Sequence, residues 1–117
     1  MSEPYDKRLI QIAKQIGEAK GIDIKEGVYI GVTGPTFETR AEYKMIQILG
    51  GDAVGMSTVQ EVIAAVHIGL KCFAMSVITD LGIRDQENKI THEEVLRAAN
   101  EAEPKFAHVF RELVAQI

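Results

Sequence analysis

Chemically capable side chains gather in the stretch GPTFETRAE, residues 34–42. Phe37 offers a flat aromatic face, and Glu38 offers a carboxylate that can accept hydrogen bonds from the N–H groups of a planar ring. The apolar run VYIGV precedes this stretch and a helical pattern follows it. The pair is therefore expected on a strand-to-helix corner, where the two elements fix the backbone and the loop side chains face outward.

Two further predicted strand ends carry groups of the same kind. GMST supplies Met56, a polarizable thioether, and Ser57, which stands beside a helix N-terminus where an anion can be held. ITD supplies Thr79 and Asp80, while His92, whose role stays ambiguous, directly precedes the last helical pattern. Together these groups imply a ligand with a planar nitrogenous ring and an anionic end.

Each of these residues also has a purely structural explanation. Glu38 can be one more solvated charge, and Phe37 and Met56 can belong to the hydrophobic core. Ser57 can serve only the turn before a helix, and Asp80 can simply end a strand. Taken one at a time, the residues leave both explanations open.

Periodicity and capping signals predict the helices that would position these groups. Apolar side chains recur at helical spacing over residues 5–20. The Thr-x-x-Glu spacing of a capping box occurs at Thr39, Thr58 and Thr91, and it predicts a helix start at each position. The helix after Thr39 is expected to end near residue 49, before two glycines.

Short apolar segments alternate with the helices. Strands are predicted at residues 28–33, 52–57 and 71–79, and residues 80–89 form a polar loop long enough to be functional. This alternation predicts one α/β domain, or part of one, with a mixed, mostly parallel sheet flanked by helices. In such sheets ligands bind beyond the carboxyl ends of the strands.

Composition narrows the class of protein further. The chain has 117 residues, 13 Lys+Arg against 17 Asp+Glu, and a net charge of −4, so nucleic acid is not an expected partner. Cys72 is the single cysteine and lies in an apolar run, which favours a buried thiol in a reducing compartment. No run of apolar residues is long enough to span a membrane, and a cytoplasmic protein is expected.

Four segments together resemble the C-terminal half of the trimeric, low-molecular-mass purine nucleoside phosphorylases: GVYIGVTGPTFETRAE, GGDAVGMSTVQEV, SVITD and THEEVLRAA. The similarity runs over essentially the whole chain. Those enzymes cleave a purine nucleoside with inorganic phosphate, giving free base and ribose 1-phosphate. The resemblance implies phosphate as a co-substrate and no other cofactor. It also implies an absent N-terminal phosphate-binding half, and either a homo-oligomer (a trimer in the family) or an N-terminal complementing chain as partner.

The resemblance also implies a role for each candidate residue. Glu38 and Asp80 would be the catalytic residues at the base, where proton-bearing groups stabilise the negative charge that the purine gains in the transition state. The purine would be bound by Phe37, Glu38, Thr79 and Asp80, the ribose by Tyr29, Met56 and His92, and the phosphate by Ser57. No metal is expected.

Two departures from the family keep alternatives open. Asp80 stands where the inosine- and guanosine-specific members carry Asn and where the related methylthioadenosine phosphorylases carry Asp. An ionised carboxylate accepts from a 6-amino group and repels a 6-oxo group, so adenosine or methylthioadenosine is an alternative substrate. Family members are also considerably longer. The chain is therefore expected to need the missing half for full activity, and a non-catalytic purine-binding or oligomerising remnant is the alternative.

Overall fold

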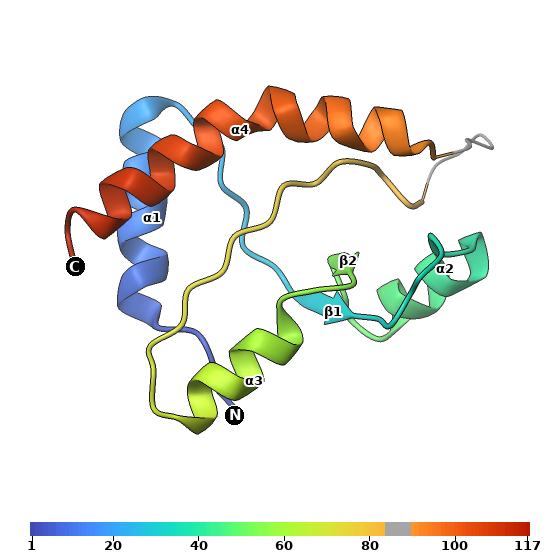
Figure 1. The fold of residues 1–117 in the computed structure, drawn as a ribbon, viewed down its shortest axis with the longest axis horizontal. Coiled ribbons are helices and arrows are strands. Elements are labelled where there is room, and N and C mark those ends of the chain that lie inside the picture. Colours follow the sequence, from blue (N-terminus) through green and yellow to red (C-terminus); the bar gives the residue numbers. More distant parts are fainter. Residues whose placement is uncertain (84–89) are drawn as a thin grey trace.

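The computed structural model describes residues 1–83 and 90–117, so residues 84–89 of the expected loop lie outside the described residues. The helices and strands alternate along the chain as the sequence predicts until α3 (Figure 1). Their bounds are α1 Lys7–Lys20, β1 Tyr29–Gly31, α2 Arg40–Ile48, β2 Ala53–Gly55, α3 Val59–His67 and α4 His92–Val114.

The two strands form a parallel sheet, which confirms the predicted strand direction. Tyr29 pairs with Ala53, and Gly31 pairs with Gly55. The Asp52 carboxylate fixes the start of this ladder, because its Oδ2 accepts a hydrogen bond of 2.8 Å from the backbone amide of Val28. The carboxyl ends of both strands therefore lie at one edge of the sheet.

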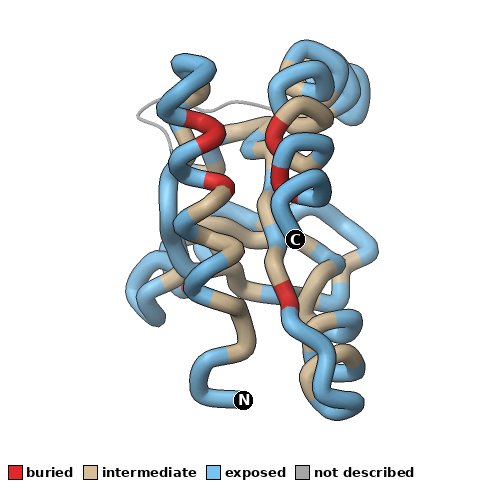
Figure 2. Tube along the Cα trace, turned by 90° about the vertical axis from the view of Figure 1, so that its left-hand side faces the viewer, coloured by how far each residue is buried: buried red, intermediate tan, exposed pale blue. Residues whose placement is uncertain are grey.

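The hydrophobic core lies between α1 and α4, away from the sheet. Its buried members come from both helices and are Ala13, Ile16, Val109 and Leu113. Phe73 extends the core, since its ring centroid lies 5.6 Å from that of Phe110 on α4. In Figure 2 the buried stretches are few and most of the trace is exposed.

The radius of gyration agrees with this open arrangement. Its value is 15.4 Å, whereas a compact domain of this length has about 13 Å. Within the described part of the chain, no helix has the length and apolar character needed to cross a membrane.

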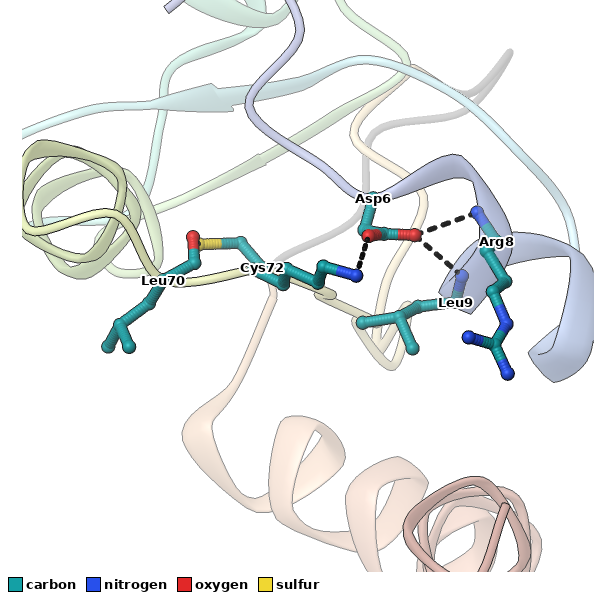
Figure 3. Close-up of polar contacts among 6 residues, drawn as sticks. Asp6, Arg8, Leu9, Leu70 and Cys72 are labelled. Atoms are coloured by element: carbon teal, nitrogen blue, oxygen red, sulfur yellow. Dashed lines mark hydrogen bonds and ion pairs between the residues drawn. The ribbon is translucent and has the colours of Figure 1, made fainter. Parts of the chain in front are cut away.

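Asp6 caps α1 and links it to a distant part of the chain. Its Oδ1 accepts hydrogen bonds from the backbone amides of Arg8 at 2.8 Å and Leu9 at 3.2 Å (Figure 3). The Asp6 amide donates to the carbonyl of Cys72 at 2.8 Å. Cys72 is buried as a free thiol, as its apolar sequence context predicts.

The predicted third strand, residues 71–79, is wrong as an assigned strand. A strand needs a ladder of hydrogen bonds to a neighbour, and among the described residues this stretch has only an isolated bridge between Tyr5 and Cys72. The backbone is nevertheless extended (Figure 1, yellow). From Phe73 to Thr79 burial alternates residue by residue, as the period of a strand requires.

Two of the three predicted capping boxes are confirmed, at Thr39 and Thr91. The one at Thr58 is wrong, although α3 does begin at the next residue. An N-cap residue needs an extended backbone, whereas Thr58 has φ 73° and its side chain makes no capping hydrogen bond. Its hydroxyl lies instead 3.2 Å from that of Ser57.

Candidate functional site

A cleft of about 530 Å³ opens at the carboxyl edge of the two-stranded sheet. It is lined by the loop after β1, by α2, by β2 with its ends, by the extended stretch before residue 84 and by the start of α4. The lining includes Phe37, Glu38, Tyr43, Ile46, residues 51–56 and 77–83, Ile90 and Val95. Five predicted site residues meet here, and they are Phe37, Glu38, Met56, Thr79 and Asp80.

The capping box of α2 positions Phe37 and Glu38. Glu42 Oε2 accepts hydrogen bonds from the backbone amide and the hydroxyl of Thr39, both at 2.7 Å. These bonds lower the pKa of Glu42, with the backbone bond as the largest cause. Because Thr39 directly follows Glu38, the cap fixes the backbone from which both side chains leave. Glu38 is half-buried, and Phe37 is 47% exposed.

The loop after β1 is tied to the end of β2. Val32 donates a backbone hydrogen bond of 2.9 Å to the carbonyl of Gly55. Gly34 has φ +63°, and a Cβ there would overlap the thioether of Met56. The absence of a side chain at Gly34 therefore lets Met56 lie directly over the loop that carries Phe37 and Glu38.

Thr79 and Asp80 reach the cleft from the extended stretch. Both side chains are half-buried, and the Oδ2 atom of Asp80 is fully buried. Gly82, two residues later, lies against the ring of Tyr43, so closely that a Cβ at Gly82 would overlap the ring. The stretch is thereby held against α2 without a ladder of backbone hydrogen bonds.

Tyr43 is a lining residue that the sequence analysis missed. Burial first, then the interaction with the Glu38 carboxylate and the negative charges of Asp80 and Glu42, raise the pKa of Tyr43 to about 12. One signal was available in the sequence. Tyr43 stands one helical turn after the cap residue Thr39, and helical side chains lean toward the N-terminus, here toward the corner.

Tyr29, Ser57 and His92 do not line the cleft. Tyr29 and Ser57 lie next to it, because the Tyr29 hydroxyl accepts a hydrogen bond of 3.3 Å from the Ser57 amide and Ser57 follows the lining residue Met56. His92 is exposed at the first position of α4, three residues before the lining residue Val95. Their ribose and phosphate roles stay predictions.

The cleft is acidic and partly apolar. Glu38 and Asp80 present carboxylates, while Phe37, Met56 and Ile46 supply apolar surface. Such a surface can stack a flat ring and hydrogen-bond its polar edge. Within the part of the chain that the structure describes, no group of three His, Cys, Asp or Glu side chains is arranged to hold a metal ion.

Comparison with known proteins gives this geometry a family context. The model of the phosphorylase superfamily matches residues 1–115. Purine nucleoside phosphorylase 1 of Geobacillus stearothermophilus is 42% identical over 97% of this chain and 42% of its own length. Purine nucleoside phosphorylase of Bos taurus is 46% identical over 100% of this chain and 42% of its own length. The chain thus spans less than half the length of these relatives.

Solved structures agree in fold. Purine nucleoside phosphorylase of Schistosoma mansoni in complex with adenosine superposes with a TM-score of 0.89 at 35% identity, covering 97% of this chain and 42% of that one. The same enzyme in complex with inosine gives a TM-score of 0.92 at 34% identity, covering 99% and 42%. The predicted α/β class of the nucleoside phosphorylase type is therefore confirmed.

Proposed function

Because the chain belongs to the phosphorylase superfamily, we propose that it forms the C-terminal, base-binding part of a purine nucleoside phosphorylase. The reaction is phosphorolysis of purine ribo- and deoxyribonucleosides to free purine and the pentose 1-phosphate. One observation carries the proposal. Phe37, Glu38, Met56, Thr79 and Asp80 come from three separate segments and line one cleft in a member of this superfamily.

The purine occupies the cleft in this proposal. Phe37 is half-exposed at the corner and packs on the ring, while Glu38 accepts hydrogen bonds from the six-membered ring. Thr79 and Asp80 face the five-membered ring and the 6-substituent. Met56 borders both the base and the ribose, and Tyr29 and His92 complete the ribose side.

Charge development explains how these groups promote the reaction. A phosphate oxygen forms a bond to the anomeric carbon as the bond from that carbon to the purine nitrogen breaks. The electron pair of the broken bond passes to the purine, and the sugar becomes oxocarbenium-like. Phosphate, held in part by Ser57, stabilises the sugar, while proton-bearing groups at the base, such as a protonated Asp80 that donates to a ring nitrogen, stabilise the negative charge of the purine. No covalent enzyme intermediate is required.

Asp80 favours acceptance of 6-amino purines. A carboxylate in the cleft accepts from an exocyclic amino group, whereas it repels a 6-oxo group unless it carries a proton. The Schistosoma mansoni enzyme has been captured in complex with adenosine and with inosine, so a related enzyme binds nucleosides of both types. We infer that this chain accepts adenine nucleosides alongside 6-oxo ones, with methylthioadenosine as a further candidate.

The phosphate side of the site needs residues beyond this chain. Ser57 is the single phosphate ligand predicted here, and the relatives are more than twice as long. Apolar side chains are exposed on α2 and α3, among them Met45 at 53%, Ile48 at 75% and Ile63 at 50%. Surfaces of this kind favour association. We infer that an N-terminal complementing segment or further copies of the chain, a trimer by analogy, cover them in a cytoplasmic enzyme.

A non-catalytic purine-binding or oligomerising chain is the second candidate. The observation that favours it is that Ser57 is exposed and stands outside the cleft lining. The base side could then bind purine while no phosphate is held in position for attack.

Release of free purine distinguishes the two functions. The purified chain is incubated with inosine or with adenosine, with and without inorganic phosphate, in the presence and absence of the N-terminal part of a relative. The phosphorylase function predicts purine release that depends on phosphate and is abolished in Glu38→Ala. Binding of purine without release under every condition would support the non-catalytic chain. Neither binding nor release would overturn the phosphorylase function and the purine-binding chain, and would leave the oligomerising chain.

A further inference from the structure

Residues 73–79 are extended but have no strand partner (Figure 1, yellow). None of them is proline, so each residue carries a backbone amide and a backbone carbonyl. Among the residues that the structure describes, no backbone hydrogen bond involves any of these groups. Folded proteins pair the great majority of their buried backbone polar groups, so an extended row of unpaired groups is a template for a further strand.

One face of this stretch is already fixed to the rest of the protein. Phe73 and Met75 pack against the core between α1 and α4, and the Phe73 ring lies 5.6 Å from that of Phe110. The alternate side chains are exposed, among them Ser76 and Ile78, the latter at 59%. The stretch is therefore held in strand geometry before a partner binds, which lowers the entropy cost of adding a strand.

Strand pairing starts at Cys72 and goes no further. The Cys72 carbonyl accepts a hydrogen bond of 2.8 Å from the Asp6 amide, and α1 begins at the residue after Asp6. Backbone groups of alternate residues point to the same edge of a strand. The groups of Ser76 and Ile78 therefore continue the edge that Cys72 begins, and no other described segment pairs with them there.

The solved relatives indicate where a partner comes from. The Schistosoma mansoni enzyme superposes on 97% and 99% of this chain with TM-scores of 0.89 and 0.92, although this chain covers only 42% of that one. The same extended course thus occurs within a longer folded protein. Since the described residues of the matched part supply no partner for residues 73–79, we expect the partner strand in the part that this chain does not cover.

We propose that the backbone of residues 73–79 is the docking edge for an extended strand of the N-terminal complementing part of the enzyme. The partner contributes backbone amides and carbonyls to a shared ladder, and apolar side chains that cover Ile78. Docking also fixes one side of the cleft, because Thr79 ends the stretch and lines the cleft. The inference rests on the proposed function for the existence of a complementing part.

Amide hydrogen exchange tests the docking edge. The chain is co-expressed with the tagged N-terminal part of the Geobacillus stearothermophilus enzyme. Exchange in the purified complex is then compared with exchange in the chain alone by mass spectrometry. We expect peptides that cover residues 73–79 to exchange at least about tenfold more slowly in the complex, because amides in a ladder exchange only when the pairing opens.

Ser76→Pro removes one donor from the edge. Proline has no amide hydrogen, and it is not tolerated in a strand that is paired on that side. Because Ser76 is exposed and its amide makes no hydrogen bond to the described residues, the isolated variant should unfold at the temperature of the wild type. The amount of chain that co-purifies with the tagged partner should fall at least about fivefold. Ser76→Ala is the matched control and should co-purify like the wild type.

Four results would overturn the proposal. Residues 73–79 could exchange equally fast in the complex and in the chain alone, or Ser76→Pro could co-purify as well as Ser76→Ala. The wild type could form no complex with the tagged partner. Exchange of residues 73–79 in the chain alone could also slow as its concentration rises, which would show that a second copy of the chain occupies the edge.

Exchange and purine release separate this inference from the proposed function. Slow exchange of residues 73–79 in a complex that releases no purine would support the docking edge while the phosphorylase function fails. Purine release by a complex in which these residues exchange as in the chain alone would refute the docking edge and leave the phosphorylase function.

Discussion

The hydroxyl of Tyr29 on β1 accepts a hydrogen bond of 3.3 Å from the backbone amide of Ser57, just beyond the end of β2. The same ring lies over Gly55, where a Cβ would overlap the Tyr29 hydroxyl. One side chain thus closes the end of the sheet next to the cleft. It also holds in place the two residues, Met56 and Ser57, that are proposed to face ribose and phosphate.

Removing this hydroxyl tests how much it contributes to the fold. Tyr29→Phe leaves the Ser57 amide without its side-chain acceptor, so we expect the free energy of unfolding to fall by about 1 kcal/mol. Urea denaturation followed by circular dichroism measures the change as a lower midpoint at an unchanged slope. Tyr5→Phe is the matched control. A midpoint equal to that of the wild type would show that the bond contributes nothing to stability.

Substitutions at two glycines distinguish the effect of backbone strain from the effect of a lost contact at the site. Gly34 and Gly50 both have positive φ, at +63° and +90°, but only Gly34 has a neighbour, Met56, where a Cβ would stand. Each change to Ala should cost about 1 kcal/mol of stability. Only Gly34→Ala should also weaken purine nucleoside binding, because it displaces Met56. Equal binding by the two variants in a calorimetric titration would contradict this role of Gly34.

The Thr-x-x-Glu sequences at Thr39 and Thr58 share one motif but predict different responses to mutation. Thr39→Ala removes a capping hydroxyl that accepts from the Glu42 amide at 3.2 Å, so it should cost about 1 kcal/mol. Thr58→Ala should cost little, since Thr58 makes no capping bond. Thr58→Gly should stabilise the chain by up to about 1 kcal/mol, because φ 73° is strained for a β-branched residue. Thermal unfolding should therefore rank Thr58→Gly above Thr58→Ala and Thr39→Ala lowest. Any other order would show that Thr39 does not cap α2 or that Thr58 is not strained.

The same contrast shows where sequence patterns suffice. The capping boxes at Thr39 and Thr91 were predictable because every group in them is local, within four residues of chain. Thr58 carries the identical pattern, but the short path from β2 into α3 places it in the left-handed region. That path depends on where β2 pairs, which is a tertiary property.

The site was predictable where residues follow strand ends and was missed where a helix contributes. Phe37, Glu38, Met56, Thr79 and Asp80 all follow apolar runs, and they line one cleft. Tyr43 reaches the same cleft from the second turn of α2, in a pattern that also fits an ordinary core residue. Its contact with Gly82 joins segments far apart in sequence, and spacing alone does not reveal such a contact.

Acid should weaken the cap of α1 in a defined direction. The hydrogen bond from the Leu9 amide is the largest cause that lowers the pKa of Asp6 from its ordinary value of 3.8. A lowered carboxylate pKa contributes stability that is present above 3.8 and is lost as the pH falls through the folded value. Stability of the wild type should therefore decline in acid more steeply than that of Asp6→Asn, which caps without titrating. The exposed Glu101→Gln is the control and should decline in acid like the wild type. Equally steep declines of the unfolding free energy in the wild type and in Asp6→Asn would contradict this role of Asp6.

Alkali should act on Tyr43 in the opposite direction. Its pKa rises from 10.0 in the unfolded chain to about 12 in the folded one. The folded state therefore keeps the phenol proton to a higher pH than the unfolded chain does. The contribution of Tyr43 to the free energy of unfolding is fully present below pH 10.0 and is lost as the pH rises toward 12. Tyr43→Phe should show a shallower alkaline decline in unfolding free energy than the wild type. If both proteins lose unfolding free energy equally in alkali, the loss comes from groups other than Tyr43.

Binding of free hypoxanthine to the purified chain tests the central claim most directly, because it requires the base cleft and no phosphate ligand. The account predicts saturable binding with one site per chain, lost in Glu38→Ala and retained in Glu101→Ala, which removes an exposed carboxylate on α4. Absence of binding of both hypoxanthine and adenine by the wild type, or equal binding by Glu38→Ala and Glu101→Ala, would show that this cleft is not a purine site.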